Sequence, residues 1–253
     1  MKKVFILLVM MQALQAQAQM VNIESQRMQT DSLRRAGHFN LSLSYQENNN
    51  AKFFTAKSAL ILQYKSKSLK DIFMVIGNYD LAQGNTTDFS NSGFAHFRYT
   101  RKWNGWLRWE AFSQVQYNKL LSVGMRWLTG TGPRFKLLGE KNAVAYFGTL
   151  YMYEYEEVTG SQPEIHRDHR LSSYLTMTFG FPKISGEMVA TTYFQPRINQ
   201  LDDFRIMQQA HLVFNITKKF KWSTGFSFLY DAYPPEGVTA RAITLDQGFR
   251  LDF

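Results

Sequence analysis

The feature that most constrains the fold is a two-residue alternation of apolar and polar side chains, which recurs from residue 38 to the C-terminus. It is clearest in residues 39–46, 95–100, 107–117, 170–179 and 222–231. Successive side chains of a β-strand point to opposite faces, so each segment predicts a strand with one apolar and one polar face. Helical spacing of apolar residues is hard to find. The pattern therefore predicts an all-β chain.

The alternation and the turn-forming residues between segments divide the chain into about twelve strands. One of them contains Gly130, Gly132 and Pro133, and we expect it to bulge or bend there. The expected strands lie near residues 38–46, 52–64, 69–80, 93–101, 106–116, 120–136, 142–155, 168–179, 185–195, 204–216, 221–231 and 240–253.

Strand length favours a membrane barrel over an exported soluble β-sandwich, whose strands also alternate. Sandwich strands average about five or six residues, whereas many segments here alternate for roughly nine to thirteen, which is long enough to cross a bilayer at a tilt. Aromatic residues also gather at strand ends, as at Trp103, Trp106 and Tyr151. The sequence therefore predicts a transmembrane antiparallel up-and-down β-barrel.

The connections between the expected strands agree with a barrel. Those after odd-numbered strands are often long, as at residues 81–92, 156–167, 196–203 and 232–238, whereas those after even-numbered strands are short. Outer-membrane barrels have long loops at one rim and short periplasmic turns at the other. We therefore expect both termini on the short-turn, periplasmic side.

Composition removes several other classes of protein. The mean hydropathy is -0.31, and no apolar run approaches the roughly 18 to 20 residues of a membrane-spanning helix. The 253 residues include no cysteine, which excludes disulfide scaffolds, thiol catalysis and cysteine-based zinc sites. An aromatic content of 15% is too high for a disordered chain.

The N-terminus has the pattern of an export signal. Two lysines precede an apolar run over residues 4–11, and Ala16-Gln17-Ala18 matches a cleavage site. An amphipathic first helix would need polar residues inside that run, and there are none. We therefore expect a signal peptide at residues 1–18, a periplasmic N-terminal lead-in at residues 19–37 and the barrel at residues 38–253.

The last strand ends on an aromatic residue. Phe249, Leu251 and Phe253 alternate with polar residues, and this pattern resembles the C-terminal recognition signal of outer-membrane barrels. We therefore expect these three residues to act as an assembly signal for the barrel-assembly machinery. The expected location is the outer membrane of a Gram-negative bacterium.

Motifs in the middle of the chain carry a family resemblance. The segments Phe94-Ala-His-Phe-Arg-Tyr, Trp109-Glu-Ala-Phe-Ser-Gln-Val-Gln-Tyr117, Gly130-Thr-Gly132 and His169-Arg-Leu-Ser-Ser173 occur in the order seen in the salt-induced outer-membrane protein family. The chain resembles this family, known as domain of unknown function 481, from about Asn22 to Phe253. The resemblance implies an outer-membrane barrel of uncharacterised role and supplies no catalytic residues.

If the apolar faces meet lipid, strand parity directs a set of charged side chains into the lumen. The set holds seven cations against four anions, and an arginine on the lipid face would cost about 2 to 4 kcal/mol at mid-bilayer. We favour a largely filled lumen with a structural or envelope-associated role, and the alternative is a narrow anion-preferring channel. The candidates are Arg98, Arg108, Glu110, Arg126, Arg134, Glu154, Arg170, Glu187, Arg205, Asp246 and Arg250.

Evidence for chemistry or for other partners is weak. His166, Asp168 and His169 with Ser172 and Ser173 could suggest a lipid hydrolase, an acylase or a weak metal site. However, His169 and Ser173 lie about 13 Å apart along a strand, and Ser172 points the other way. We therefore expect no enzyme, no metal and no cofactor.

Basic residues are spread through the strands, so we expect contact with outer-membrane lipids and lipopolysaccharide rather than nucleic acid. Membership of a larger envelope complex stays open.

Overall fold

The structure is a computed structural model that describes residues 20–27, 33–48, 51–85, 88–160, 163–217, 220–234 and 238–251. Twelve strands make up nearly all of these residues, together with short 3-10 helices at Glu24–Gln26 (η2), Lys119–Leu121 (η3) and Pro182–Ile184 (η4). The strands are β1 (Arg35–Asn48), β2 (Ala51–Lys65), β3 (Asp71–Gln83), β4 (Asp88–Lys102), β5 (Leu107–Asn118), β6 (Val123–Glu140), β7 (Ala143–Val158), β8 (Glu164–Phe181), β9 (Gly186–Arg197), β10 (Gln200–Asn215), β11 (Phe220–Asp231) and β12 (Arg241–Leu251).

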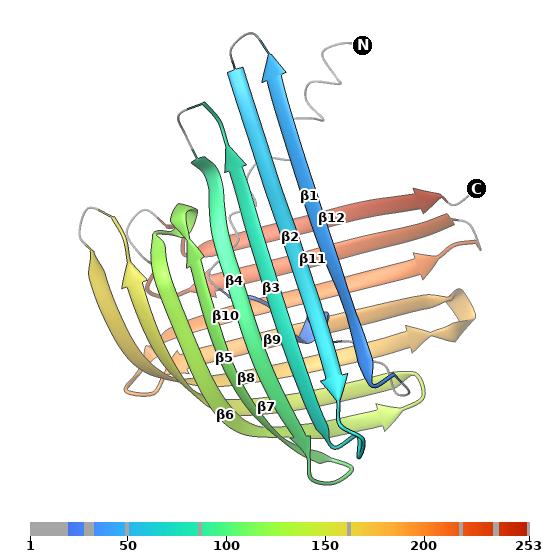
Figure 1. The fold of residues 1–253 in the computed structure, drawn as a ribbon. Coiled ribbons are helices and arrows are strands. Elements are labelled where there is room, and N and C mark those ends of the chain that lie inside the picture. The colour runs from blue at the N-terminus through green and yellow to red at the C-terminus, as the bar shows by residue number, and fades with distance from the viewer. Residues whose placement is uncertain are drawn as a thin grey trace.

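All twelve strands belong to one antiparallel sheet in which each strand pairs with the next along the chain, from β1 to β12. The sheet curls around a central interior, with the strands strongly tilted (Figure 1). The predicted up-and-down barrel of about twelve strands is therefore confirmed. Among the described residues, no backbone pairing joins β1 to β12, which lie at the two ends of the strand order.

The alternation places opposite kinds of side chain on the two faces of the sheet. On β5, for example, Glu110 and Gln114 are buried inside, whereas Trp109 and Val115 are exposed outside. The same contrast holds on β4, where Arg98 is buried and Phe97 is 46% exposed. An exterior of apolar side chains around a polar interior suits a barrel in a bilayer. Among the described residues, no helix has the length and apolar character of a membrane-spanning helix.

The strands are longer than expected, which shortens the connections between them. β7 and β8 continue pairing as far as Val158 and Glu164, and β9 and β10 leave only residues 198–199 between them. The predicted long loops at 81–92, 156–167 and 196–203 are therefore wrong, and only the connection between β11 and β12 stays long. Polar residues at the strand ends still pair through their backbones, and the alternation of side chains does not predict that pairing.

The expected distortion at Gly130 to Pro133 is also absent from the described pairing. β6 keeps one register with β5 through these residues, and its register shifts with β7 lie at Val123/Met125 and Lys136/Leu138 instead. Gly132 permits a close approach of the strands, because a Cβ there would lie only 2.7 Å from the Leu150 Cα. The glycines therefore serve packing between strands rather than a bulge.

Two rims bound the barrel. The turn rim comprises the connections after even-numbered strands, at residues 66–70, 103–106, 141–142 and 182–185, together with the β10–β11 connection. The loop rim comprises the connections after odd-numbered strands, including residues 119–122 and the β11–β12 connection. The predicted signal peptide at residues 1–18 and the terminal Phe253 lie outside the described residues.

Candidate functional site: a charged interior that contains the N-terminal segment

The barrel interior holds two networks of buried charged side chains. One is centred on Glu110 and lies toward the turn rim, where β5 begins. The other is centred on Glu154 and lies toward the loop rim, where β7 ends. Both carboxylates are fully buried, at 0% exposure. Buried carboxylates need paired cations and hydrogen-bond donors, and the interior supplies both.

The Glu110 carboxylate is held from four directions. Arg98 Nη1 lies 3.0 Å from Oε2 and Arg27 Nη2 2.5 Å from Oε1. Tyr174 and Thr100 donate hydrogen bonds to the same carboxylate, at 2.7 Å and 3.1 Å. Charge-assisted hydrogen bonds of this kind are about twice as strong as neutral ones. The network therefore joins β4, β5 and β8 across the lumen.

The Glu154 carboxylate is held by three arginines. Arg170 Nε lies 2.6 Å from Oε2, and Arg205 Nη1 lies 2.6 Å from Oε1. Arg126 Nε lies 2.8 Å from Oε1. These guanidinium groups continue to further carboxylates, namely Glu156, Asp203, Asp231 and Asp168, and Asp168 and Asp203 also bind Arg197. The network therefore joins β6 to β11.

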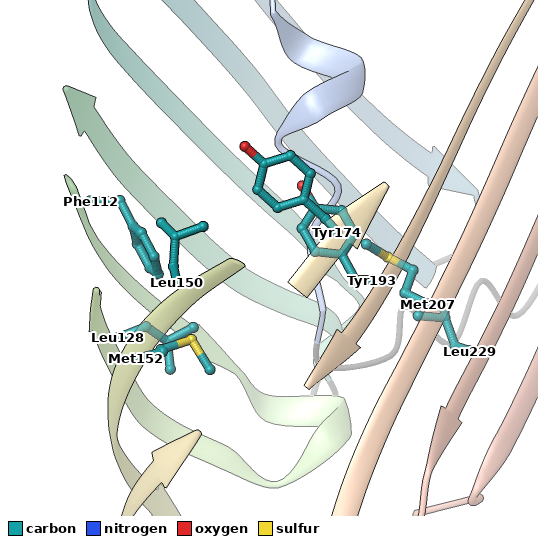
Figure 2. Close-up of a cluster of buried hydrophobic side chains, with 8 residues drawn as sticks. All are labelled: Phe112, Leu128, Leu150, Met152, Tyr174, Tyr193, Met207 and Leu229. Carbon is teal, nitrogen blue, oxygen red and sulfur yellow. The ribbon is translucent and has the colours of Figure 1, made fainter. Parts of the chain in front are cut away.

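An apolar cluster also fills part of the interior. It comprises Phe112, Leu128, Leu150, Met152, Tyr174, Tyr193, Met207 and Leu229, which come from seven consecutive strands, β5 to β11 (Figure 2). Met207 and Leu150 are almost completely buried, at 0% and 1% exposure. Buried apolar side chains inside the sheet leave less room for a continuous water path.

The N-terminal segment, Met20 to Arg27, lies inside the barrel. It is the short blue piece in the interior in Figure 1, and its turn passes close to Tyr174 and Tyr193 in Figure 2. Ile23 packs on Ile61, Met74 and Ile76 of β2 and β3. The segment therefore contacts both halves of the barrel wall.

Glu24 is the centre of the contacts that the N-terminal segment makes. Its Oε2 lies 2.6 Å from Arg134 Nη1, and its Oε1 lies 3.3 Å from Arg98 Nη1. Asn22 adds a hydrogen bond from Nδ2 to Gln209 Oε1 of β10, at 2.9 Å. Without Glu24 the Glu110 network would hold three arginines and one carboxylate. The segment therefore contributes one carboxylate, Glu24, and one guanidinium group, Arg27, to this network.

The sequence matches a known family over most of its length. The sequence profile of the family described as "Protein of unknown function, DUF481" covers residues 40–253. The chain belongs to the DUF481 family. No curated protein matches the sequence at a significant level. The solved structure titled "NanC porin structure in rhombohedral crystal form" aligns over 87% of this chain and 98% of that chain, with 11% identity and a TM-score of 0.46.

Family and architecture agree on the class of protein. The resemblance noted in the sequence is confirmed by the profile match. A twelve-stranded up-and-down sheet with an apolar exterior and a polar interior is the architecture of an outer-membrane β-barrel. This DUF481 chain is therefore an outer-membrane barrel, and its specific role is a separate question.

Most of the predicted lumen charges lie where strand parity placed them. Arg98, Glu110, Arg126, Arg134, Glu154, Arg170 and Arg205 are all buried in the two networks. Arg108 is half-buried and donates to the Tyr146 hydroxyl instead. Glu187 at the start of β9 and Asp246 in the middle of β12 are exposed, and among the described residues they join neither network. The side chain of Arg250 lies outside the described residues.

The predicted surplus of lumen cations is absent within the two networks, and Lys65 and Arg108 lie on the inner face outside them. Among the described residues, the two networks contain seven arginines and seven carboxylates. The network members that the sequence did not predict are Glu24, Arg27, Glu156, Asp168, Arg197, Asp203 and Asp231. Glu156 and Asp168 follow the parity of Glu154 and Arg170, so strand alternation could have found them. Asp203 was missed because β10 starts earlier than expected.

The periplasmic location expected for the lead-in stays a prediction, and the described part of it lies inside the barrel. Met20 packs against the cluster that contains Leu229 and lines a small cavity with Leu121 of the loop rim. Residues 35–37 already belong to β1. Residues 20–27 carry no strand alternation, so their place inside the barrel is set by ion pairs that the sequence pattern does not display.

The histidine and serine cluster is divided between the two faces of β8. Asp168 points inward to Arg197, and Ser172 accepts a hydrogen bond from Gln195 inside. His169 is exposed outside and stacks on Tyr151. The described residues contain no group of three side chains that could hold a metal ion. The structure therefore does not bring these residues together as a catalytic or metal site.

The assembly-signal residues lie at the end of the sheet. Phe249 is 71% exposed and pairs through its backbone with Trp222 of β11. Leu251 pairs with Phe220, and its side chain lies outside the described residues. The assembly role of Phe249, Leu251 and Phe253 stays a prediction.

Gly148 makes room for the ring of Tyr174, and its replacement tests that packing. A Cβ at Gly148 would lie 2.3 Å from Tyr174 Cε1 and Cζ, so Gly148→Ala must displace the ring that binds Glu110. We expect a loss of about 1 to 3 kcal/mol in unfolding free energy, measured by urea denaturation in detergent micelles. In the control, Gly105→Ala, the Cβ meets no atom within 4 Å. Equal losses in both variants would contradict this role of Gly148.

Proposed function

We propose that this DUF481 protein is a closed outer-membrane barrel with a structural or envelope-associated role. The observation that carries the proposal is the position of Glu24, whose carboxylate binds Arg134, Arg98 and Arg27 inside the lumen. A free segment would take Glu24 and Arg27 out of the network and leave Arg98 and Arg134 with Glu110 alone, so the ion pairs hold the segment in place. The lumen is then filled by the segment, the ion pairs and the apolar cluster.

Charge balance within the two networks supports a filled barrel over an open pore. An anion channel needs a continuous path with a cation surplus, whereas the described networks pair seven arginines with seven carboxylates. Paired and buried charges stiffen a barrel wall, because breaking one pair leaves the other charge without a partner. The expected periplasmic location of both termini and the absence of enzymatic activity remain part of this proposal.

A second candidate is a channel that opens when the N-terminal segment leaves. A cavity of about 400 Å³ lies beside the segment, lined by polar side chains of β1 to β5 such as Asn40, Lys57, Asn78 and Gln116, and it reaches Val21 of the segment. Removal of the segment would join this cavity to the space around Glu110. The channel would then be the segment-free state of the same barrel.

Conductance and fractionation test the proposal together. We expect the protein to fractionate with the outer membrane, to migrate faster on gels before heating than after, and to show no steady conductance in planar bilayers. A soluble periplasmic monomer would contradict the barrel, and a steady anion-selective conductance of the wild type would contradict the closed state.

A further inference from the structure

The two rims of the barrel carry different charge. At the turn rim there are seven exposed cations and three carboxylates, namely the exposed Glu140 and Glu187 and the half-buried Asp71, which pairs with Arg101. The cations are Arg34, Arg35, Lys67, Lys70, Arg101, Lys141 and Lys183. At the loop rim, the exposed cations Lys52, Lys119, Arg167 and Arg241 stand against Glu47, Glu164 and Asp202. Among the described residues, the positive charge of the surface is thus concentrated at the turn rim.

Aromatic side chains lie at the same level as these cations. Trp103 and Trp106 of the β4–β5 turn are 59% and 56% exposed. Trp103 stacks on Trp109 with ring centroids 5.7 Å apart, and Trp106 stacks on Phe135 at 5.9 Å. Exposed tryptophans next to lysines are typical of the membrane–water interface, where the rings reach the headgroup level. The turn rim therefore combines an interfacial belt with a ring of positive charge.

We propose that the turn rim binds the headgroups of anionic phospholipids. The cations occur at the start of β1 and in or beside four of the five turns of this rim, so they surround the barrel rather than form one patch. Each lysine or arginine near an anionic surface adds attraction that is screened within a Debye length. With the termini on the periplasmic side, as the proposed function has them, the lipopolysaccharide expected from the overall charge would instead meet the loop rim, where cations and carboxylates nearly balance.

The tryptophans of the turn rim report on the lipid beside them. In vesicles of phosphatidylcholine with a minor fraction of phosphatidylglycerol, we expect brominated phosphatidylglycerol to quench tryptophan fluorescence more than the same fraction of brominated phosphatidylcholine. The preference should reach at least about fivefold in relative binding, which is roughly the contribution of one lysine at such a surface. It should weaken strongly at about 1 M salt, where screening is nearly complete.

Matched variants test which rim produces the preference for anionic lipid. Replacing Lys67, Lys70, Lys141 and Lys183 with Gln should abolish the preference, whereas the same change at Lys52, Lys119, Arg167 and Arg241 should leave it intact. Equal losses in both variants would show an effect of net charge alone and would overturn the proposal. A turn-rim variant that keeps the lipid preference but no longer sediments with purified peptidoglycan would also overturn it, in favour of a cell-wall partner.

Discussion

Reversing the charge of Arg126 or Arg170 is expected to cost about 3 to 5 kcal/mol of unfolding free energy. Arg126 binds Glu154 and Glu156, and Arg170 binds Glu154 and Asp203, all inside the barrel. In Arg126→Glu and Arg170→Glu, a new carboxylate would face carboxylates that have each lost one of their arginines. The measurement is urea denaturation of the refolded barrel, followed by heat-modifiable gel migration.

A surface variant separates this effect from a change in net charge. Arg241→Glu makes the same substitution at an exposed site at the start of β12, and we expect it to change the unfolding free energy by less than about 1 kcal/mol. If Arg126→Glu and Arg170→Glu unfolded like wild type, and the wild type conducted anions steadily, the arginines would line an open pore. The closed-barrel proposal would then be wrong.

Glu24→Arg is expected to open the lumen. The substitution places a fourth cation beside Arg27, Arg98 and Arg134, with Glu110 as the remaining anion, so the segment is repelled from the network. Breaking a buried pair costs about 3 to 5 kcal/mol, and each 1.4 kcal/mol changes a population about tenfold. We therefore expect the open population to rise about 100-fold or more, measured as steady conductance in planar bilayers.

Two controls test whether the N-terminal segment itself closes the lumen. Ser25→Arg adds a cation at the neighbouring exposed position of the segment and should leave the barrel closed. The chain contains no cysteine, so Asn22→Cys and Gln209→Cys can be joined by a short bifunctional thiol reagent across their contact. In the Glu24→Arg background this link should suppress the conductance. A Glu24→Arg barrel that stays closed without the link would contradict the role of the segment.

These two predictions concern the two different ion-pair networks of the interior. The Glu154 network ties strands β6 to β11 to one another, so its loss is expected to weaken the barrel wall. The Glu110 network ties the barrel wall to the N-terminal segment, which lies inside the barrel but belongs to no strand. Loss of Glu24 is therefore expected to change conductance while the strand pairing remains. A large loss of unfolding free energy in Glu24→Arg without conductance would mean that the segment stabilises the barrel as part of its core and does not gate the lumen.

The sequence determined the architecture and the facing of most side chains. Because the side-chain period of a strand is two, the alternation was enough to place Arg98, Glu110, Arg126 and Glu154 in the interior. It also predicted about twelve strands, each paired with the next along the chain as observed. Strand ends were less predictable, because polar residues such as Glu157 and Gln200 pair through their backbones without any alternation that marks them.

Only the tertiary structure decided which charges meet and what fills the lumen. Arg205 reaches Glu154 although 51 residues separate them in sequence, because the curvature and stagger of the sheet set which side chains face each other. Glu24 and Arg27 belong to a segment without strand periodicity, and their place follows from the buried arginines of distant strands. Alternation fixes the face of a residue, whereas its partner depends on how the sheet curves around the interior.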